Sequence, residues 1–468
     1  MIQPVGIGRL IVVVRSANKR LSPGTNKTSV RGANNNYGDY EPLLGILLPL
    51  ILLVVAADVA LPANPIPLPE FTEYQVPRTP VPEANPAWRE YLDLAALAVG
   101  LSLASYLALR RRSRRGLFLL TIASLAWLGF WRQGCTCPIG AIQNVTLAVC
   151  DPGYAVPAAT VAFFVLPLVF ALFFGRTFCA AVCPLGAVQE LVALRPVRLP
   201  GWLEHTLGLL AYVYLGLAVV YAATGTAFVI CRYDPFVAFF RLGGDLNMLI
   251  LGGCFLVAGI FIGRPYCRFL CPYGVLLRWA SKVSKWHVRI PPDECIKCRL
   301  CEDVCPYGAI RQPTVVQDAG QRAEGRRRLA ALIVLLPVLV AGGAWLGSGL
   351  SVPLAKLHPT VRLAEQMRLE ETGRAEGSTD ASDAFRATGR PLGDLYRDAI
   401  KLQTGRFVAA GRWLGGWVGL VIALKLIHLC LRRRRDDYQP DRGTCVSCGR
   451  CFWYCPNQQA LNNGGVKI

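Results

Sequence analysis

Two stretches of the chain each carry four cysteines with the same spacing, Cys-x2-Cys-x2-Cys-x3-Cys-Pro. They are Cys295, Cys298, Cys301 and Cys305 in the first run, and Cys445, Cys448, Cys451 and Cys455 in the second. In bacterial ferredoxins such a run gives three thiolates to one [4Fe–4S] cluster, and the fourth ligates the other cluster. Zinc sites are usually built from separated Cys-x2-Cys pairs instead. The spacing therefore predicts two [4Fe–4S] clusters that carry electrons.

The two runs together predict one bacterial-type 2[4Fe–4S] ferredoxin module that is split in the sequence. In the exchanged arrangement, one cluster takes Cys295, Cys298, Cys301 and Cys455, and the other takes Cys445, Cys448, Cys451 and Cys305. The alternative is a local arrangement, in which each run holds its own cluster with all four cysteines.

A second pattern occurs twice, as "GRTFCAAVCPLG" at 175–186 and "GRPYCRFLCPYG" at 263–274. Each copy follows an apolar run and contains a Cys-x3-Cys-Pro pair, which places two thiols on one helical face. The pairs are Cys179 with Cys183 and Cys267 with Cys271. Three interpretations remain for these span-end pairs: a shared third iron–sulfur cluster, redox-active dithiols, or structural cysteines. Arg176 and Arg264 would offset the charge of a thiolate site.

A third fragment, "WRQGCTCPIGAIQN" at 131–144, contains a shortened version of the pair, Cys135-x-Cys137-Pro138. In the topology predicted below, this fragment and Cys231 lie on the same external face. Two interpretations are open for these cysteines. One is an external disulfide, and the other is a metal or redox site that takes electrons across the membrane.

The composition indicates a mainly α-helical, polytopic membrane protein. Hydrophobic residues make up 53% of the 468 residues, whereas charged residues make up only 17%. About eight apolar runs approach the length needed to cross a bilayer. The net charge is +20, and the basic residues stand in short clusters at the ends of these runs. This distribution excludes nucleic acid as a partner and indicates that the lipid bilayer is the main one. The runs lie near 43–61, 91–109, 116–131, 157–175, 206–228, 246–264, 329–347 and 413–431.

The positive-inside rule orients these spans. Because five arginines lie within 110–115, that connection should be cytoplasmic, and alternation then places both cysteine runs in the cytoplasm. Two spans separate the runs, so the chain returns to the same face. The expected location is the bacterial cytoplasmic (inner) membrane, crossed several times. The expected segments are a disordered cytoplasmic tail (1–41), a transmembrane core of about six helices (42–290), the first ferredoxin half (291–315), a helical hairpin (326–431) with an external segment (348–412), and the second ferredoxin half (440–468).

Within the external segment, "VRLAEQMRLEE" and "PLGDLYRDAIKLQ" predict two short amphipathic helices. Ser382 or Asp383 is the candidate helix cap in the linker between them. A docking surface for an external partner and a simple spacer are the two interpretations of this segment.

The two ferredoxin runs, the span-end pairs and "GCTCPIGAIQN" together resemble the NosR/NapH-type membrane polyferredoxins, over roughly 116–310 and 413–456. The resemblance implies [4Fe–4S] ligation by the eight cysteines of the runs. It also implies electron transfer between the quinol pool or a cytoplasmic donor and a periplasmic acceptor. NosR-like members carry an external flavin-binding domain before these spans. Here the corresponding loop, 61–90, is a proline-rich stretch without a flavin site, so that module is absent from this chain or lies on a separate flavin-binding subunit.

The sequence thus predicts a membrane-bound electron-transfer protein, a non-catalytic subunit of an oxidoreductase system. Its expected partners are quinol or a cytoplasmic donor and a membrane or periplasmic reductase subunit. The alternative is an assembly, maturation or redox-sensing factor for a periplasmic metalloenzyme. No residue pattern indicates a general acid, base or nucleophile that acts on a substrate.

Overall fold

A computed structural model describes most of residues 87–456, and all of the described residues lie in the compact unit Leu50–Ile468. The gaps in the description are 135–136, 195, 198, 242, 244, 291–294, 315–317, 376 and 432–434. The expected tail (1–41) and the first expected span (43–61) lie outside the described residues. Cys135 lies outside them as well.

The other seven expected spans each coincide with a helix. Among the described residues, four helical stretches are long and apolar enough to cross a membrane, namely Trp88–Leu109, Gly201–Ala223, Ala319–Ser348 and Leu392–Cys430. The remaining spans are shorter or interrupted, so the expected count of eight stays a prediction. The helices are α2 (Ala87–Leu109), α3 (Arg114–Ser124) with the π-helix η1 (Leu125–Trp131), α5 (Ala158–Phe174), α7 (Gly201–Ala223), α10 (Leu246–Phe261), α14 (Ala319–Ser348) and α19 (Phe407–Cys430).

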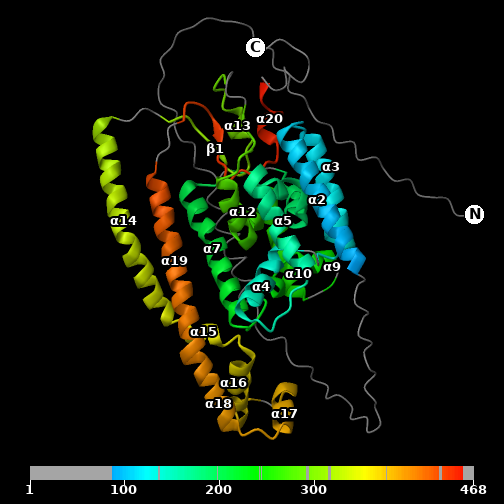
Figure 1. Ribbon diagram of the computed structural model, residues 1–468, viewed down its shortest axis with the longest axis vertical. Helices are drawn as coiled ribbons and strands as arrows, with labels where there is room; N and C mark the ends of the chain where they lie inside the picture. Colours follow the sequence, from blue (N-terminus) through cyan, green and yellow to red (C-terminus); the bar gives the residue numbers. More distant parts are fainter. Residues whose placement is uncertain are drawn as a thin grey trace, which may run out of the picture. The chain divides into compact units, whose positions relative to one another are not determined.

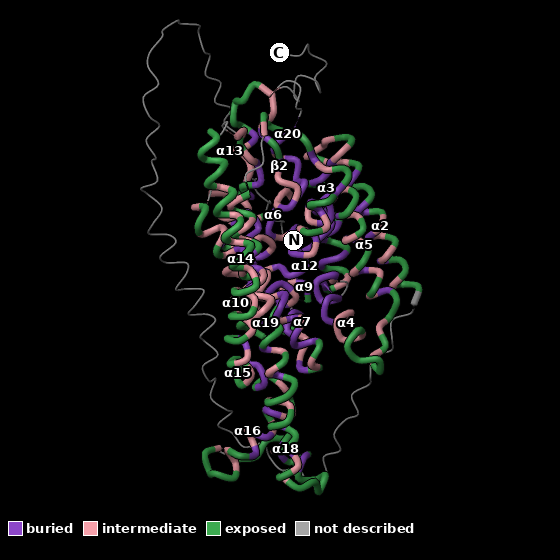
Figure 2. Tube along the Cα trace, turned by 60° about the vertical axis from the view of Figure 1, so that its left-hand side comes forward, coloured by how far each residue is buried: buried purple, intermediate pink, exposed green. Residues whose placement is uncertain are grey.

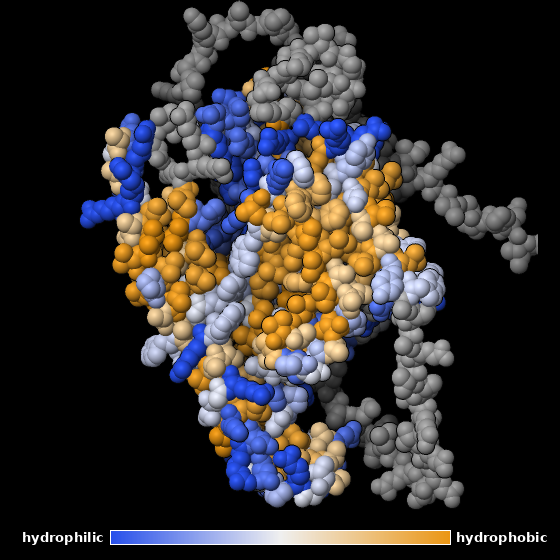
Figure 3. Space-filling model, in the orientation of Figure 1, coloured by the Kyte–Doolittle hydropathy of each residue, from blue (hydrophilic) through white to orange (hydrophobic). Residues whose placement is uncertain are grey.

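Large apolar side chains cover the outside of these helices, as expected for a surface in contact with lipid. Val99 of α2, Val257 of α10 and Val334 of α14 are all more than half exposed, at 66%, 51% and 72%. Figure 3 shows broad hydrophobic areas over the middle of the helices, with hydrophilic side chains gathered at both ends. The chain is therefore a membrane protein by its surface as well as by its composition.

Helix α7 connects two regions at opposite ends of the helical core. At its start, Glu204 pairs with Arg268, whose Nη1 also donates to the carbonyl of Pro306 beside the first cysteine run. Near the end of α7, Tyr221 packs in a hydrophobic cluster with Phe407 and with the helices that precede Phe407 in the chain. Seventeen residues separate Glu204 from Tyr221, which is about 25 Å at a rise of 1.5 Å per residue. We call these the ferredoxin end and the far end; they lie at opposite ends in Figures 1 and 2.

Helices α14 and α19 pack against each other as a hairpin and lie side by side in Figure 1. Glycines line the seam where the two backbones touch: a Cβ on Gly347 would collide with the carbonyl of Gly411, and one on Gly415 with that of Gly343. Small residues of this kind allow close helix contact inside a bilayer. The hairpin is attached to the core through Trp417, whose indole donates to the carbonyl of Tyr212 on α7.

The far end carries a small helical cluster between the two hairpin helices. The two expected amphipathic helices are present as α16 (Pro359–Glu371) and α18 (Leu392–Lys401), next to α15 (Ser351–Ala355) and the π-helix η3 (Leu402–Arg406). The linker contains another helix, α17 (Asp380–Ala387), and its cap is Thr379 rather than Ser382 or Asp383. Ser382 is the third residue of this helix, and its hydroxyl accepts a hydrogen bond from the Thr379 N–H, which completes a capping box.

Short elements complete the core and the ferredoxin end. They are α4 (Pro138–Cys150), η2 (Phe178–Val182), α6 (Pro184–Val192), α8 (Val229–Arg232), α9 (Val237–Arg241), α11 (Pro265–Phe269), α12 (Pro272–Lys282), α13 (Leu300–Asp303), β1 (Ile310–Arg311), β2 (Gln439–Pro440) and α20 (Arg450–Trp453).

Candidate iron–sulfur sites

The two cysteine runs fold into loops with the same backbone conformation. Lys297 and Arg299 have positive φ angles in the first loop, and Ser447 and Gly449 have them at the matching positions of the second. In both loops the turn leads into a single helical turn, α13 or α20, that carries the third cysteine. Left-handed residues at fixed positions turn a short segment tightly, so the cysteines of each run can face a common centre.

The halves of the ferredoxin module join although more than a hundred residues separate them. Strand β1 pairs antiparallel with β2, with Ile310 opposite Pro440. Beyond the strands, the Asp441 N–H donates to the carbonyl of Ala309 at 2.7 Å. Helices α13 and α20 also touch. The module is thus one structure built from both halves.

One cavity of the module is lined by Cys305 from the first run and by Cys445, Cys448 and Cys451 from the second. Burial raises the pKa of the Cys451 thiol well above its ordinary value, and the nearby sulfurs of Cys445, Cys448 and Cys305 raise it further. The geometry therefore brings together the four cysteines expected to share a cluster in the exchanged arrangement. A local arrangement would have required Cys455 in this cavity in place of Cys305.

Three cysteines of the first run form the second group. Burial raises the pKa of Cys301 to about 11, with further contributions from Cys295 and Cys298. Cys455, the expected fourth ligand, follows α20 by two residues, and α20 contacts α13, which carries Cys301. Cys298 is exposed, so this group lies nearer the surface than the first.

The donor set of the enclosed group fits a [4Fe–4S] cluster. Four buried thiols cannot all ionise unless a positive centre compensates their charge, and iron supplies one. A cubane is held by four cysteine thiolates, and this group offers four cysteines.

The two span-end pairs converge on one buried site between the repeats. Burial raises the pKa of Cys183 well above its ordinary value, and the thiolates of Cys267, Cys179 and Cys271 all raise it further. Cys183 and Cys271 are the N-cap residues of α6 and α12, and each is followed by proline at the first helical position. The Gly274 N–H donates to the Cys271 sulfur at 3.3 Å. Helix N-termini favour negative charge, so the positions of these two thiols offset part of the cost of burying their thiolates.

The arginine of each repeat packs against a glycine of the other repeat. Arg264 of the second repeat lies against Gly186 of the first, where a Cβ would come within 3.1 Å of its Nη1. Arg176 of the first repeat lies against Gly274 of the second, at 3.5 Å from the equivalent Cβ position. The glycine in each "CPxG" sequence therefore makes room for the guanidinium of the other repeat.

Both arginines also connect the span-end site with the ferredoxin module. Arg176 Nη2 lies 3.6 Å from the Cys179 sulfur, and Arg176 Nη1 donates to the carbonyl of Gly443, two residues before Cys445. Arg264 donates to the carbonyl of Cys179 and interacts electrostatically with both Cys267 and Cys448. The role proposed for these arginines from sequence, to offset thiolate charge, is consistent with these positions.

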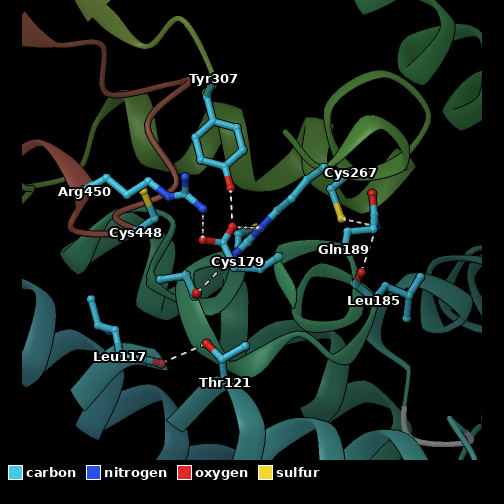
Figure 4. Close-up of polar contacts among 12 residues, drawn as sticks. Leu117, Thr121, Cys179, Leu185, Gln189, Cys267, Tyr307, Cys448 and Arg450 are labelled. Atoms are coloured by element: carbon cyan, nitrogen blue, oxygen red, sulfur yellow. Dashed lines mark hydrogen bonds and ion pairs between the residues drawn. The ribbon is translucent and has the colours of Figure 1, made fainter. Parts of the chain in front are cut away.

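Glu190 of α6 is the centre of the contact between the module and the core. Its carboxylate pairs with Arg264 at 3.1 Å, Arg450 at 2.9 Å and Arg114 at 2.5 Å, and it accepts a hydrogen bond from the Tyr307 hydroxyl at 2.8 Å. Tyr307 and Arg450 come from the two ferredoxin halves and are labelled in Figure 4, where dashed lines mark the contacts of their side chains. Burial would raise the pKa of Glu190, but the three guanidiniums outweigh it and hold the pKa far below its usual range.

Sequence reasoning missed Glu190 and its neighbour Gln189, whose side chain donates to the Cys267 sulfur at 3.3 Å. An amide and a carboxylate at the fifth and sixth residues after the Cys183-Pro184 pair look like the polar face of a surface helix. The one available signal was an acidic residue within a segment in which all the other charged residues are arginines.

At the far end the structure brings Cys137 and Cys231 into one polar pocket with Asp234. Burial and the neighbouring Asp234 raise the pKa of Cys137 to about 12. No disulfide joins these two cysteines in the part of the chain that the structure describes. The interpretations as a disulfide or a redox site therefore both stay predictions.

Two protein-family models match the chain, and each is described as a 4Fe-4S binding domain. One covers residues 156–202 and 245–291, which contain the span-end pairs, and the other covers 288–311, which contains the first ferredoxin run. NirI of Paracoccus denitrificans is 30% identical over 55% of this chain, and the regulatory protein NosR of Pseudomonas aeruginosa is 30% identical over 30% of it. The ferredoxin-type protein MauN of Methylobacillus flagellatus is 25% identical over 31%. The chain therefore carries 4Fe-4S binding domains and is similar to membrane-associated proteins of the polyferredoxin type.

The chain spans 42% of the length of NirI, 21% of NosR and 53% of MauN. It therefore shares a part of these relatives, and their full activities do not transfer with that part. No solved structure matches the chain at a significant level. The resemblance inferred from the cysteine patterns is confirmed at the level of the family.

Proposed function

We propose that this polyferredoxin conducts single electrons between its ferredoxin module and a third iron–sulfur site, held by Cys179, Cys183, Cys267 and Cys271 between the two repeats. A bound [4Fe–4S] cluster accepts and donates one electron at a time. The observation that carries the proposal is the position of Cys179. This span-end cysteine packs against the same small hydrophobic cluster as Cys305 and Cys445 of the module.

The protein's own contribution is to hold thiolates close together in a buried place. Arg176 and Arg264, both buried and both in contact with Cys179, compensate negative charge at the span-end site and at the module. The hydrogen bonds from Gln189 to the Cys267 sulfur and from Gly274 to the Cys271 sulfur act in the same direction. Hydrogen bonds to the sulfurs and burial are also what set the reduction potential of such sites.

The ferredoxin end is proposed to face the cytoplasm. Basic side chains gather there: Arg114 donates to the carbonyl of Cys448, and Arg268 to that of Pro306. Such an excess of arginine is typical of the cytoplasmic side of a membrane protein. The electron donor would then be quinol or a cytoplasmic protein, and the acceptor a membrane or periplasmic partner, with any flavin on a separate subunit.

The first test is the iron and acid-labile sulfide content per chain of anaerobically purified protein, with EPR spectra before and after reduction. Three [4Fe–4S] sites give about twelve irons, and the module alone gives about eight. Zinc in place of iron would contradict electron transfer altogether.

A double variant, Cys183→Ser with Cys271→Ser, isolates the third site. We expect it to lose about four irons per chain and one EPR signal, while the spin-coupled signal of the module persists. Cys254→Ser in α10 is the matched control, because that residue belongs to neither cysteine pattern. A double variant with unchanged iron content would remove the third site from the proposal but leave the module in place.

Rapid mixing with a quinol or with a low-potential donor tests the electron-transfer role itself. Reduction that is fast and reversible is the expected result. An assembly or sensing factor would be reduced slowly or only once, without turnover.

A further inference from the structure

A cavity of roughly 280 Å³ opens at the ferredoxin end between α7, α12 and α19. Its apolar wall includes Trp279, Trp417 and Leu424, and Trp279 and Leu424 are 39% and 50% exposed. Gly443 and Thr444, which lead into Cys445, form another side. The cavity is therefore open toward the lipid-facing surface and lies next to a cysteine run.

The charges that line this cavity do not balance. Five cations line it, but only two carboxylates do, and each of these is already paired: Glu204 with Arg268 at 2.8 Å, and Asp441 with Arg311 at 3.5 Å. The remaining three cations, Arg278, Lys282 and Lys425, form no ion pair with a carboxylate in the part of the chain that the structure describes, although Asp441 and Glu204 act electrostatically on Arg278 and Lys425.

Arg278 is the most buried of the three. Its Nε is buried without a hydrogen-bond partner, although Tyr212 shares a hydrogen bond with its side chain. Burial and the nearby Arg176 lower the pKa of Arg278. An unsatisfied guanidinium N–H beside other cations costs free energy unless an anion occupies the space.

The internal repeat allows Arg278 to be compared with the equivalent residue of the first repeat. Arg278 lies 88 residues after Glu190, the same offset that relates Arg176 to Arg264. In the first repeat this position holds the carboxylate that neutralises three arginines. In the second repeat the same position holds a cation, and its neighbours are cations as well. The second repeat therefore lacks the anion that the first repeat supplies from its own chain.

We infer that this cavity binds the phosphate head group of an anionic phospholipid, with Arg278, Lys282 and Lys425 around the phosphate and the acyl chains along Trp417 and Leu424. Basic pockets between membrane helices near the cytoplasmic face are suited to such head groups. A soluble phosphate would leave the apolar wall unused. A Cβ on Gly443 would meet Arg278 Cγ at 3.2 Å and Lys282 Cε at 3.4 Å, so the lipid-binding cations also support the loop that leads to Cys445.

Native mass spectrometry of the full chain, purified in detergent and stripped of lipid, tests this inference. Phosphatidylglycerol, phosphatidylcholine and inorganic phosphate are added separately. We expect one phosphatidylglycerol to be retained per chain, at least tenfold more tightly than phosphatidylcholine. We also expect Arg278→Gln and Lys425→Gln each to weaken its retention roughly fivefold.

Arg327→Gln is the matched control, because Arg327 is an exposed cation on α14 outside the cavity, and it should leave retention unchanged. Iron content serves as the folding check, and Lys425→Gln carries the test if Arg278→Gln does not fold. Two results would overturn the inference: retention of inorganic phosphate as tight as that of phosphatidylglycerol, or equal retention of both lipids.

Discussion

Replacing Glu190 by glutamine is expected to loosen the ferredoxin module from the membrane core. The substitution keeps the size of the side chain but removes the charge that three guanidiniums share. Arg264 is 2% exposed, while Arg114 and Arg450 are 18% and 20% exposed. Removal of one partner from a buried ion pair costs about 3–5 kcal/mol. Since the amide of glutamine still accepts hydrogen bonds, we take the lower bound, about 3 kcal/mol.

A loss of about 3 kcal/mol corresponds to a roughly hundredfold increase in the population of the undocked module, at 1.4 kcal/mol per factor of ten. Hydrogen exchange measures such local opening directly. Peptides that cover Tyr307–Ile310 and Val446–Phe452 should exchange about a hundredfold faster in Glu190→Gln, and peptides of the α14–α19 hairpin should not change. Glu324→Gln is the control, because Glu324 makes an exposed pair with Arg328 and should alter exchange by less than twofold.

Unchanged exchange in the two ferredoxin segments would refute this reasoning. It would mean that strand pairing and cysteine ligation hold the module without the carboxylate. Equal acceleration in every helix would also count against it, because Glu190 would then stabilise the whole core and not the contact.

The pKa of Glu190 lies below its usual range, so its stabilisation is present above the unfolded pKa and is lost only as pH falls far into the acid. Docking should therefore be independent of pH between about 6 and 8.

Three further predictions concern the α14–α19 seam, the glycines of the two repeats and Asp234. Gly347→Leu should force α14 and α19 apart and lower thermal stability by at least about 1–3 kcal/mol, while Gly342→Leu, where a Cβ meets nothing within 4 Å, should be neutral in the same melting assay. Gly186→Ala should reduce iron content more than Gly274→Ala, because its Cβ would lie closer to the opposing arginine, at 3.1 Å against 3.5 Å. Burial raises the pKa of Asp234 from 3.8 to about 6, so its ionisation destabilises the fold as pH rises through this range, by about 3 kcal/mol at neutral pH. Asp234→Asn should remove that pH dependence from the melting temperature.

The helices and the ferredoxin loops could be predicted from the sequence because their signals are local. The α14 and α19 spans are long apolar runs, and the spacing of Cys445 to Cys455 is contained in twelve residues. The pairing of the two halves was also predictable, since two spans between them return the chain to one side. Those inferences need only periodicity, spacing and a count of crossings.

Glu190 could not be predicted, because its role depends on contacts that are distant in sequence. Arg450 lies 260 residues away from it and Tyr307 lies 117 away. Within "PLGAVQELV" nothing distinguishes a buried carboxylate from one on the exposed face of a helix. The cap at Thr379 was missed for a smaller reason. The third residue of its capping box is Ser382, where glutamate or glutamine is the usual signal.

In the sequence, the helical hairpin is inserted between the two halves of the ferredoxin module, directly after β1 and before β2. The pairing of these two strands explains why the module tolerates this insertion. Arg311 lies opposite Gln439, so the chain leaves the module and returns to it at neighbouring points. The next pair outward continues this contact, because the Thr314 N–H donates to the carbonyl of Arg435 at 2.9 Å. An insertion that begins and ends side by side leaves the cysteine loops undisturbed, whatever its length. Two antiparallel helices satisfy this condition in a membrane, and the glycine seam keeps their backbones in contact along the way. The module can thus be interrupted by a membrane hairpin because its own strands hold the two ends of the interruption together.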